Sequence, residues 1–224
     1  MKGILISTRP EWVIKIITGI KRDEIRKGSS LYKAINKLIA EQGVAPTFIY
    51  CTKNNKQGLV FDSEGKGLVN SKLFPYAKNC PEHNRLINGK VVARFNATAD
   101  LLELKMIEGG LYFTTPDRDC FTPNLDLNEN AQMDNWQLLR YTGEKLGTRI
   151  TDIHITNLEI FDKPKDISEF HKVDESWGFI CYNCPHFYTD DSAGYSIDGC
   201  DLGFENCEKT RLTRAPHSWC YVEE

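Results

Sequence analysis

The chain has 224 residues, of which 41% are hydrophobic and 11% are aromatic. This composition is typical of a folded globular protein and excludes a disordered chain. No apolar run approaches the roughly 20 residues needed to cross a bilayer, and the apolar stretch at the N-terminus is too short for a signal peptide. We therefore expect a cytoplasmic protein.

The charged residues are divided unevenly along the chain. Residues 1–100 contain 17 Lys and Arg against 8 Asp and Glu, whereas residues 101–224 contain 11 against 23. The net charge of −3 by itself argues against a nucleic-acid-binding protein. The asymmetry, however, is typical of a basic binding half beside an acidic half. Ordinary solvated surface is the alternative explanation.

The N-terminal segment predicts a strand, a helix and a second extended stretch. Residues 3–7 form a short apolar strand. Pro10 suits only the first turn of a helix, and apolar residues then recur on one side until Gly19, a residue typical of a helix end. Residues 22–27 should be extended.

The next elements are predicted from the periodicity of apolar residues and from residues that end helices and strands. A second helix is predicted over Ser30–Gln42, because apolar residues recur at helical spacing and Gly43 follows. Residues 47–53 are rich in strand-forming side chains. Residues 54–85 carry many Asn, Gly, Lys and Ser, which indicates an insertion loop or a short hairpin.

The remaining strands define the expected fold class. Residues 88–90 form a Gly turn that leads into a strand at 91–95, and residues 96–148 are weakly patterned. Residues 150–161 alternate again, which predicts a late strand with one buried face and a bulge near Asn157. Several short strands, two early helices and no βαβ alternation favour a mixed α/β fold: a small β-barrel with flanking helices.

The most informative segment reads Gly19-Ile20-Lys21-Arg22-Asp23-Glu24-Ile25-Arg26, a G-x-K-x-x-E-x-R pattern. Lys21 and Arg26 can hold a phosphate or a carbonyl oxygen, one as a point charge and the other as a two-pronged fork. Glu24 can accept a hydrogen bond from a base amino group. We therefore predict a basic cleft for RNA or a nucleotide, with Lys53 as a further phosphate contact.

Two other interpretations of this segment stay open. A desolvated Lys21 beside Glu24 could act as a base or nucleophile if its pKa were lowered by several units, which would make the protein an enzyme. Strict strand alternation places these two side chains on opposite faces, so they converge only if Lys21 lies in the turn after Gly19. The third interpretation is a surface ion pair of Glu24 with Arg22 or Arg26, worth about 0–1 kcal/mol.

Three aromatic side chains outside this segment are weaker candidates. Trp12 and Tyr50 could stack on a base, although aromatic residues in amphipathic helices and strands usually belong to the core. His154 lies between Ile153 and Ile155 in the late strand, where a histidine is more often a wall residue than a catalyst.

Cysteines gather near the C-terminus. Four of them follow the spacing C-x2-C-x15-C-x6-C, namely Cys181, Cys184, Cys200 and Cys207. Four thiolates at such spacing predict a tetrahedral structural zinc site, which would order a segment with little apolar content. His186 and Cys220 are candidate substitute ligands. Disulfides and free thiols are the alternatives, and disulfides suit poorly a chain without an export signal.

Taken together, these motifs resemble the ASCH domain, a branch of the PUA-like fold. The resemblance rests on the G-x-K-x-x-E-x-R segment after a Pro-Glu-Trp helix, on residues 48–53, 88–93 and 153–164, and on the tail at 212–220. The tail is similar to that of ASCH-like proteins common in bacteriophages and prophages. The resemblance implies an ASCH domain at 1–165, built as a five- or six-stranded barrel with a cleft beside the motif. A Cys-rich, zinc-binding segment would follow at 166–224.

The resemblance also implies the handling of RNA or a modified nucleotide, with DNA as a second possible nucleic acid. Some members resemble ribonucleases, and another branch consists of 4-acetylcytidine amidohydrolases that use a Lys, a Thr and a Glu. Lys21 matches the lysine of that branch, and Glu24 stands where it has threonine. A nucleoside amidohydrolase or a ribonuclease using these two residues is therefore the alternative to a binding module. A phage-encoded protein that binds a host protein through its acidic half is a third hypothesis.

Overall fold

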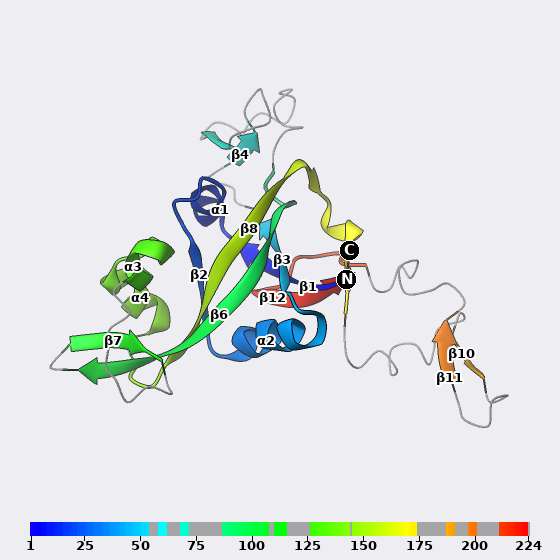
Figure 1. Ribbon diagram of the computed structural model, residues 1–224. Helices are drawn as coiled ribbons and strands as arrows, with labels where there is room; N and C mark the ends of the chain where they lie inside the picture. The colour runs from blue at the N-terminus through cyan, green and yellow to red at the C-terminus, as the bar shows by residue number, and fades with distance from the viewer. Residues whose placement is uncertain are drawn as a thin grey trace.

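The structure is a computed structural model of the chain, shown in Figure 1. It describes residues 1–53, 58–61, 68–71, 87–107, 110–115, 126–143, 145–173, 187–190, 197–200 and 211–223. Within these ranges, no helix is both long and apolar enough to cross a membrane.

The described residues form strands joined by a few helices. The strands are β1 (Lys2–Thr8), β2 (Asp23–Lys27), β3 (Pro46–Cys51), β4 (Gly58–Phe61), β5 (Leu68–Ser71), β6 (Val91–Ile107), β7 (Gly110–Thr114), β8 (Arg149–Lys165), β9 (His171–Lys172), β10 (Phe187–Asp190), β11 (Ile197–Cys200) and β12 (Trp219–Glu223). The helices are α1 (Pro10–Ile17), α2 (Ser30–Gln42), α3 (Asp126–Ala131) and α4 (Asn135–Thr142). A 3-10 turn spans Ile167–Glu169.

One eight-stranded sheet holds most of these strands together. Its order is β2-β8-β6-β3-β1-β12-β9, with β7 paired to β6. The β1–β3 pair is parallel and the other pairs are antiparallel. Two further pairs, β4–β5 and β10–β11, form separate two-stranded sheets. The prediction of a mixed α/β fold is confirmed.

The sheet is open, so the prediction of a closed barrel is wrong for the described part of the chain. The reason lies in β1, whose two edges are both occupied: β3 pairs along one and β12 along the other. Strand β2 therefore ends the sheet on one side and β9 ends it on the other.

The open sheet nevertheless curls back on itself. Strands β2 and β1 are four strand-to-strand steps apart in the sheet order, which would separate them by about 19 Å if the sheet were flat. Yet the Arg26 Nη2 atom on β2 donates a hydrogen bond of 2.9 Å to the Ser7 carbonyl on β1. A side chain thus makes the contact that backbone pairing would make in a barrel.

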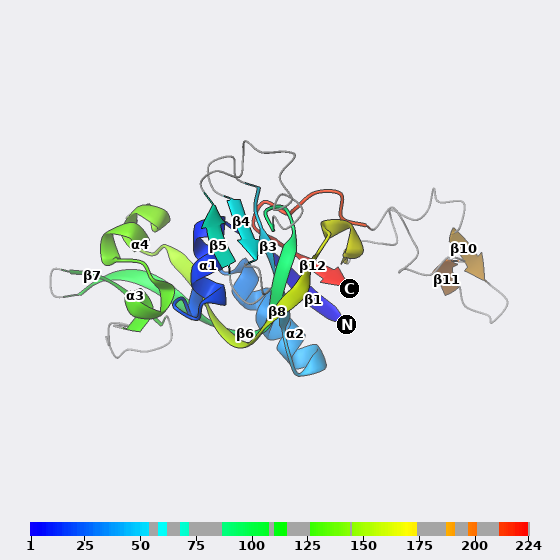
Figure 2. The same ribbon diagram turned by 90° about the horizontal axis from the view of Figure 1, so that it is seen from above.

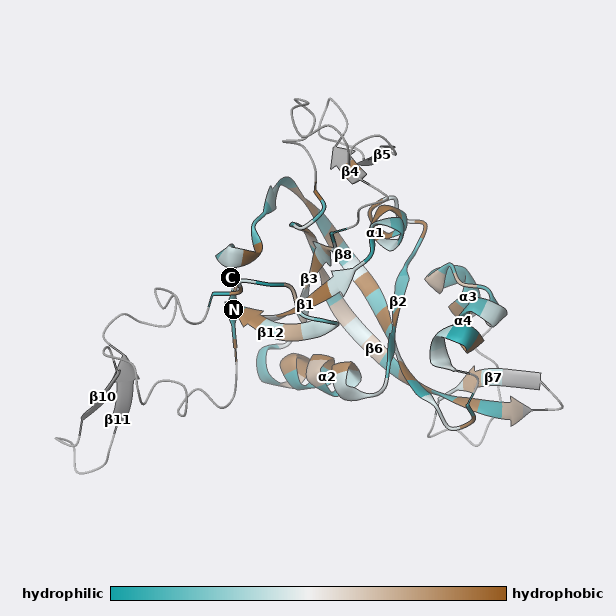
Figure 3. Cartoon of the chain, turned by 180° about the vertical axis from the view of Figure 1, so that it is seen from behind, coloured by the Kyte–Doolittle hydropathy of each residue, from teal (hydrophilic) through white to brown (hydrophobic). Residues whose placement is uncertain are grey.

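Three apolar clusters hold the layers together. The largest packs α1 and α2 against one face of the sheet, through residues such as Val13, Ile35 and Ile49. Figure 3 shows hydrophobic residues along the central strands and on α2. A second cluster joins α3 and α4 to the far ends of β6 and β8. These helices lie with β7 at one end of the molecule, away from the termini (Figures 1 and 2).

The third cluster covers the other face of the sheet and includes Tyr50. This tyrosine is only 6% exposed, so it belongs to the core, as expected of an aromatic residue in a strand, and is not placed to stack on a base. Val222 of β12 belongs to the same cluster. The C-terminal strand is therefore built into the main sheet.

Most predicted elements occur at the predicted places. The helix over Ser30–Gln42 has those bounds, and Gly43 ends it in the left-handed conformation with φ of 81°. The bulge near Asn157 is confirmed, because the β6–β8 register shifts there and Asn157 has φ of 50°. The strand at 91–95 is longer than predicted and continues to Ile107.

Candidate functional site

The turn after α1 brings Lys21 beside Glu24. Gly19 has φ of 73°, and the Lys21 amide donates to the Lys15 carbonyl at 2.9 Å. Lys21 therefore still lies in the turn when β2 begins at Asp23. This meets the condition under which the two side chains were expected to converge.

Glu24 is held between the buried Lys21 and the mostly buried Arg26. Its Oε2 atom lies 3.5 Å from Lys21 Nζ, and its Oε1 atom accepts from Arg26 Nη2 at 2.8 Å. The side chains of Lys21, Glu24 and Arg26 are 2%, 7% and 12% exposed. The predicted pairing of Glu24 with Arg26 therefore occurs, but its location at the surface is wrong. We call these three residues the charged triad.

The charged triad joins three separate parts of the chain. Lys21 Nζ donates to the Ala131 carbonyl of α3 at 2.7 Å. Arg26 Nη2 donates to the Ser7 carbonyl at 2.9 Å and to Thr8 Oγ1 at 3.2 Å. Strand β2, the end of β1 and the end of α3 thus meet at these side chains.

Burial lowers the pKa of Lys21 below its usual value, and the adjacent Glu24 carboxylate opposes this effect without cancelling it. Removing a charged amine from water disfavours its protonated form. Lys21 consequently loses its proton more readily than a surface lysine. This property would suit a residue that exchanges protons with a ligand.

A pocket of about 420 Å³ opens above the charged triad. Its lining comes from β1, α1, β2, α4, the tail and the segments that adjoin α1, β2, β3 and α4: Ser7, Thr8, Arg9, Trp12, Lys21, Glu24, Ile25, Arg26, Thr52, Met133, Tyr141 and His217. Its size lies within the range of small-ligand pockets, about 300–1,000 Å³. The lining combines charged side chains with apolar ones such as Trp12, Ile25 and Met133, so it could orient a ligand with one polar edge.

Of the remaining predicted site residues, some lie at the pocket and others do not. Trp12 lines the pocket, and its ring centroid lies 4.9 Å from Lys15 Nζ and 5.0 Å from Lys21 Nζ. Lys53 does not line it; its side chain lies along Gly89, where an added Cβ would come within 3.0 Å of Lys53 Cε. The cysteines predicted to bind zinc lie outside the described residues, except that Cys200 ends β11.

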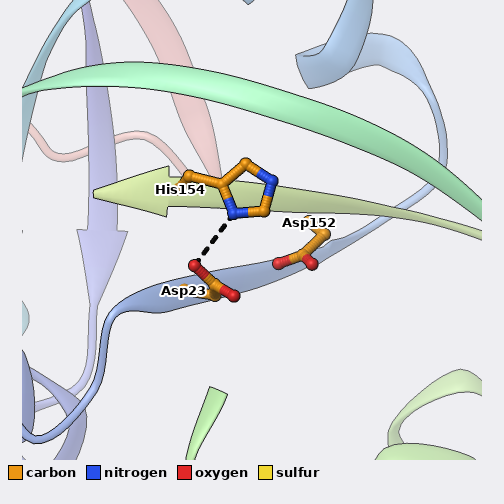
Figure 4. Close-up of side chains that lie close together, drawn as sticks. All are labelled: Asp23, Asp152 and His154. Atoms are coloured by element: carbon orange, nitrogen blue, oxygen red, sulfur yellow. Dashed lines mark hydrogen bonds and ion pairs between the residues drawn. The ribbon is translucent and has the colours of Figure 1, made fainter. Parts of the chain in front are cut away.

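A second polar cluster, shown in Figure 4, consists of Asp23, Asp152 and His154. The register pairs Asp23 with His154 and Ile25 with Asp152 across β2 and β8, which puts the three side chains on one face. His154 Nδ1 lies 3.0 Å from Asp23 Oδ1, and its Nε2 lies 3.3 Å from Asp100 Oδ2. One potential ligand atom from each of the three residues lies within 4.8 Å of the others, so the cluster could hold a metal ion.

Sequence reasoning found only the histidine of this cluster. The available signal was the spacing Asp152-x-His154, which puts both side chains on one face of a strand. Asp23 pairs with them only through the β2–β8 register. The pocket residues Thr52, Tyr141 and His217 were missed for the same reason, since they come from distant segments.

The environment of this cluster raises two pKa values. Burial, reinforced by the neighbouring Asp23 carboxylate, raises the pKa of Asp152 to about 7. The hydrogen bond to Asp23 is the main reason that the pKa of His154 rises to about 9, against the opposing effect of burial. In the metal-free cluster at neutral pH, His154 is therefore mostly protonated and Asp152 keeps its proton in only part of the molecules.

Comparison with known proteins adds no assignment: the chain matches no protein-family model and no curated protein.

The two raised pKa values predict that the metal-free protein loses stability as pH increases. Asp152 contributes fully below its usual pKa of 3.8, and this contribution is lost as pH rises through about 7. The contribution of His154 is complete below 6.5 and is lost as pH rises through about 9. With divalent cations chelated, these two groups should lower the free energy of unfolding in urea between pH 5 and pH 9.

Asp152→Asn should flatten the part of this decline below about pH 7, because the asparagine does not titrate. The control is Asp162→Asn, an exposed aspartate on the same strand. An unchanged pH profile in Asp152→Asn would contradict the assignment.

Proposed function

We propose that the protein binds a nucleotide unit of RNA, or a modified nucleoside, in the pocket above the charged triad. The observation that carries this proposal is the burial of Lys21, Glu24 and Arg26 at the floor of that pocket. Taking three charges out of water costs more than a similar apolar arrangement would. Buried charges that line a cavity are therefore candidates for ligand recognition rather than for stability.

The floor of the pocket suits the polar edge of a nucleobase. Each Glu24 oxygen accepts from one cation and retains a lone pair, so it can accept from an exocyclic amino group. Among the described residues, the Lys21 ammonium directs two of its three donors at Glu24 and Ala131. The third donor is available for a carbonyl oxygen of the base.

The walls and rim suit the rest of a nucleotide. Trp12, Met133 and Tyr141 offer apolar and aromatic surface for a base or ribose. Arg9 and His217 line the pocket and are exposed, so they can meet a phosphate at the opening. The basic first half of the chain and the resemblance to the ASCH domain support the same class of ligand.

This proposal predicts salt-dependent binding of a short single-stranded RNA, measured by the anisotropy of a fluorescent label. Arg9→Ala should weaken binding roughly three- to tenfold and reduce the salt slope by about 1, because one phosphate contact is lost. The matched control is Arg149→Ala, another exposed arginine with one ion pair, outside the pocket. Absence of binding at low salt, or equal loss in both variants, would refute the proposal.

A second candidate function, hydrolysis of an amide on a modified base, is favoured by the lowered pKa of Lys21 beside Glu24. A neutral Lys21 amine can take a proton from a water molecule as the water oxygen attacks the acyl carbon. The carbon–nitrogen bond then breaks, and the same proton passes to the departing amine. The products are a carboxylic acid and the unmodified base.

This second candidate predicts that the protein converts 4-acetylcytidine to cytidine and acetate, followed by mass spectrometry. Lys21→Met should lower the rate at least about a hundredfold, the usual minimum contribution of a general base. Lys15→Met is the control, because Lys15 also contacts the Trp12 ring but does not line the pocket. If the wild type forms no cytidine, amide hydrolysis is excluded and binding alone stands.

We also propose a structural zinc ion held by Cys181, Cys184, Cys200 and Cys207. Its support is the C-x2-C-x15-C-x6-C spacing, which suits four tetrahedral thiolate ligands. The metal would order the segment that contains them.

The zinc content of the purified protein tests this site. The four cysteines together should hold about one zinc ion per protein molecule, measured by plasma mass spectrometry. Cys181→Ser combined with Cys184→Ser should lose that equivalent, whereas Cys120→Ser, an isolated cysteine, should keep it. Equal zinc content in both variants would contradict the assignment.

A further inference from the structure

We propose that Asp23, Asp152 and His154 form a binding site for a divalent first-row cation such as Mn²⁺ or Zn²⁺. The site would join strand β2 to strand β8. It is separate from the cysteine segment and does not depend on which ligand enters the pocket. Three independent features of the cluster support it.

The first feature is an unsatisfied buried carboxylate. Asp152 is fully buried, and within the described part of the chain neither of its carboxylate oxygens has a hydrogen-bond partner. Buried polar atoms in folded proteins are nearly always paired, because an unpaired buried charge is very costly. Figure 4 shows this carboxylate beside Asp23 and His154, where a cation would supply the missing partner.

The second feature is the spacing of the ligand atoms. One ligand atom from each of the three residues lies within 4.8 Å of the others, and Asp23 Oδ1 lies 3.0 Å from His154 Nδ1. Ligands bonded to one metal at about 2.1 Å are roughly 3–4 Å apart. A cation can therefore sit among them with small side-chain movements.

The third feature is the partner of the other imidazole nitrogen. His154 Nε2 lies 3.3 Å from Asp100 Oδ2, so an Nε2–H group can donate to this carboxylate. In that tautomer Nδ1 carries a lone pair and faces Asp23 (Figure 4). Metal-binding histidines are commonly oriented by such a carboxylate on the far nitrogen, and Asp100 would have this positioning role.

The ligand set indicates the class of metal. Two carboxylates and one imidazole suit Mn²⁺ or Zn²⁺, whereas Ca²⁺ needs six to eight oxygen ligands. Three protein ligands leave further coordination positions for water or another molecule. The His154 side chain is 35% exposed, so those positions can be reached from solvent on that side.

The rival arrangement is a hydrogen-bonded cluster without metal. A doubly protonated His154 would donate to both Asp23 and Asp100, and Asp152 would be a neutral acid. The two arrangements differ in whether the cluster has affinity for a cation, so direct binding distinguishes them.

The test uses Mn²⁺, because thiolates prefer softer metals and the cysteine segment should not compete for it. The chelator-treated full-length protein is titrated with Mn²⁺ and followed by paramagnetic resonance and by thermal unfolding. At a concentration a hundredfold above the dissociation constant, the melting temperature should rise by roughly 5–10 °C. The variants are Asp152→Asn and His154→Gln, with Asp162→Asn as the exposed control on the same strand.

The wild type and Asp162→Asn should bind Mn²⁺ and gain stability. Asp152→Asn should lose both effects while its metal-free form melts no lower than the wild type, because an amide cannot take the charged form that is costly at a buried position without a hydrogen-bond partner. His154→Gln tests the site independently if Asp152→Asn does not fold. The proposal is overturned if the wild type does not bind Mn²⁺ or if both cluster variants bind it as tightly as the wild type.

Discussion

The ion pair between Arg26 and Glu24 is the interaction on which the shape of the candidate site depends. Arg26 reaches from the edge strand β2 to the end of β1, and it is oriented by a carboxylate that is itself held by Lys21. Because both edges of β1 are already paired, this side chain is the described hydrogen-bonded link between β2 and β1. Without it, no hydrogen bond described for residues 1–53 would join β2 to β1 across the curl of the sheet.

The two polar clusters use side chains on opposite faces of β2. Glu24 and Arg26 point toward the pocket, whereas Asp23 faces His154 and Asp152 on β8. Alternation along a strand makes this division unavoidable. Strand β2 thus contributes residues both to the charged triad, which lines the pocket, and to the cluster of Asp23, Asp152 and His154. Both clusters affect the pKa of Lys21, because the carboxylates of Glu24, Asp152 and Asp23 all raise it.

Local features of this chain were readable from the sequence, and relations between distant strands were not. The helix at Ser30–Gln42 and the bulge near Asn157 follow from periodicity and turn residues. The convergence of Lys21 and Glu24 depended on one turn, and Gly19 pointed to it. Neither the openness of the sheet nor the pairing of Asp23 with His154 follows from local pattern, because both depend on which strand occupies which edge. Asp152 is buried and has no hydrogen-bond partner among the residues that the structure describes, which contradicts the usual rule for carboxylates. Its burial was therefore not predicted from the sequence.

The contacts between β1 and the distant residues 216–223 have a consequence for folding during synthesis. The Ser7 hydroxyl donates to the Pro216 carbonyl, 209 positions later, and the Ser7 amide donates to Ser218. A chain emerging from the ribosome therefore leaves one edge of β1 without its partner until the residues of β12 have appeared. Contacts this distant in sequence slow folding, and an unpaired strand edge invites association with other chains. The wall of the pocket that contains His217 thus cannot form before this part of the chain has been synthesised.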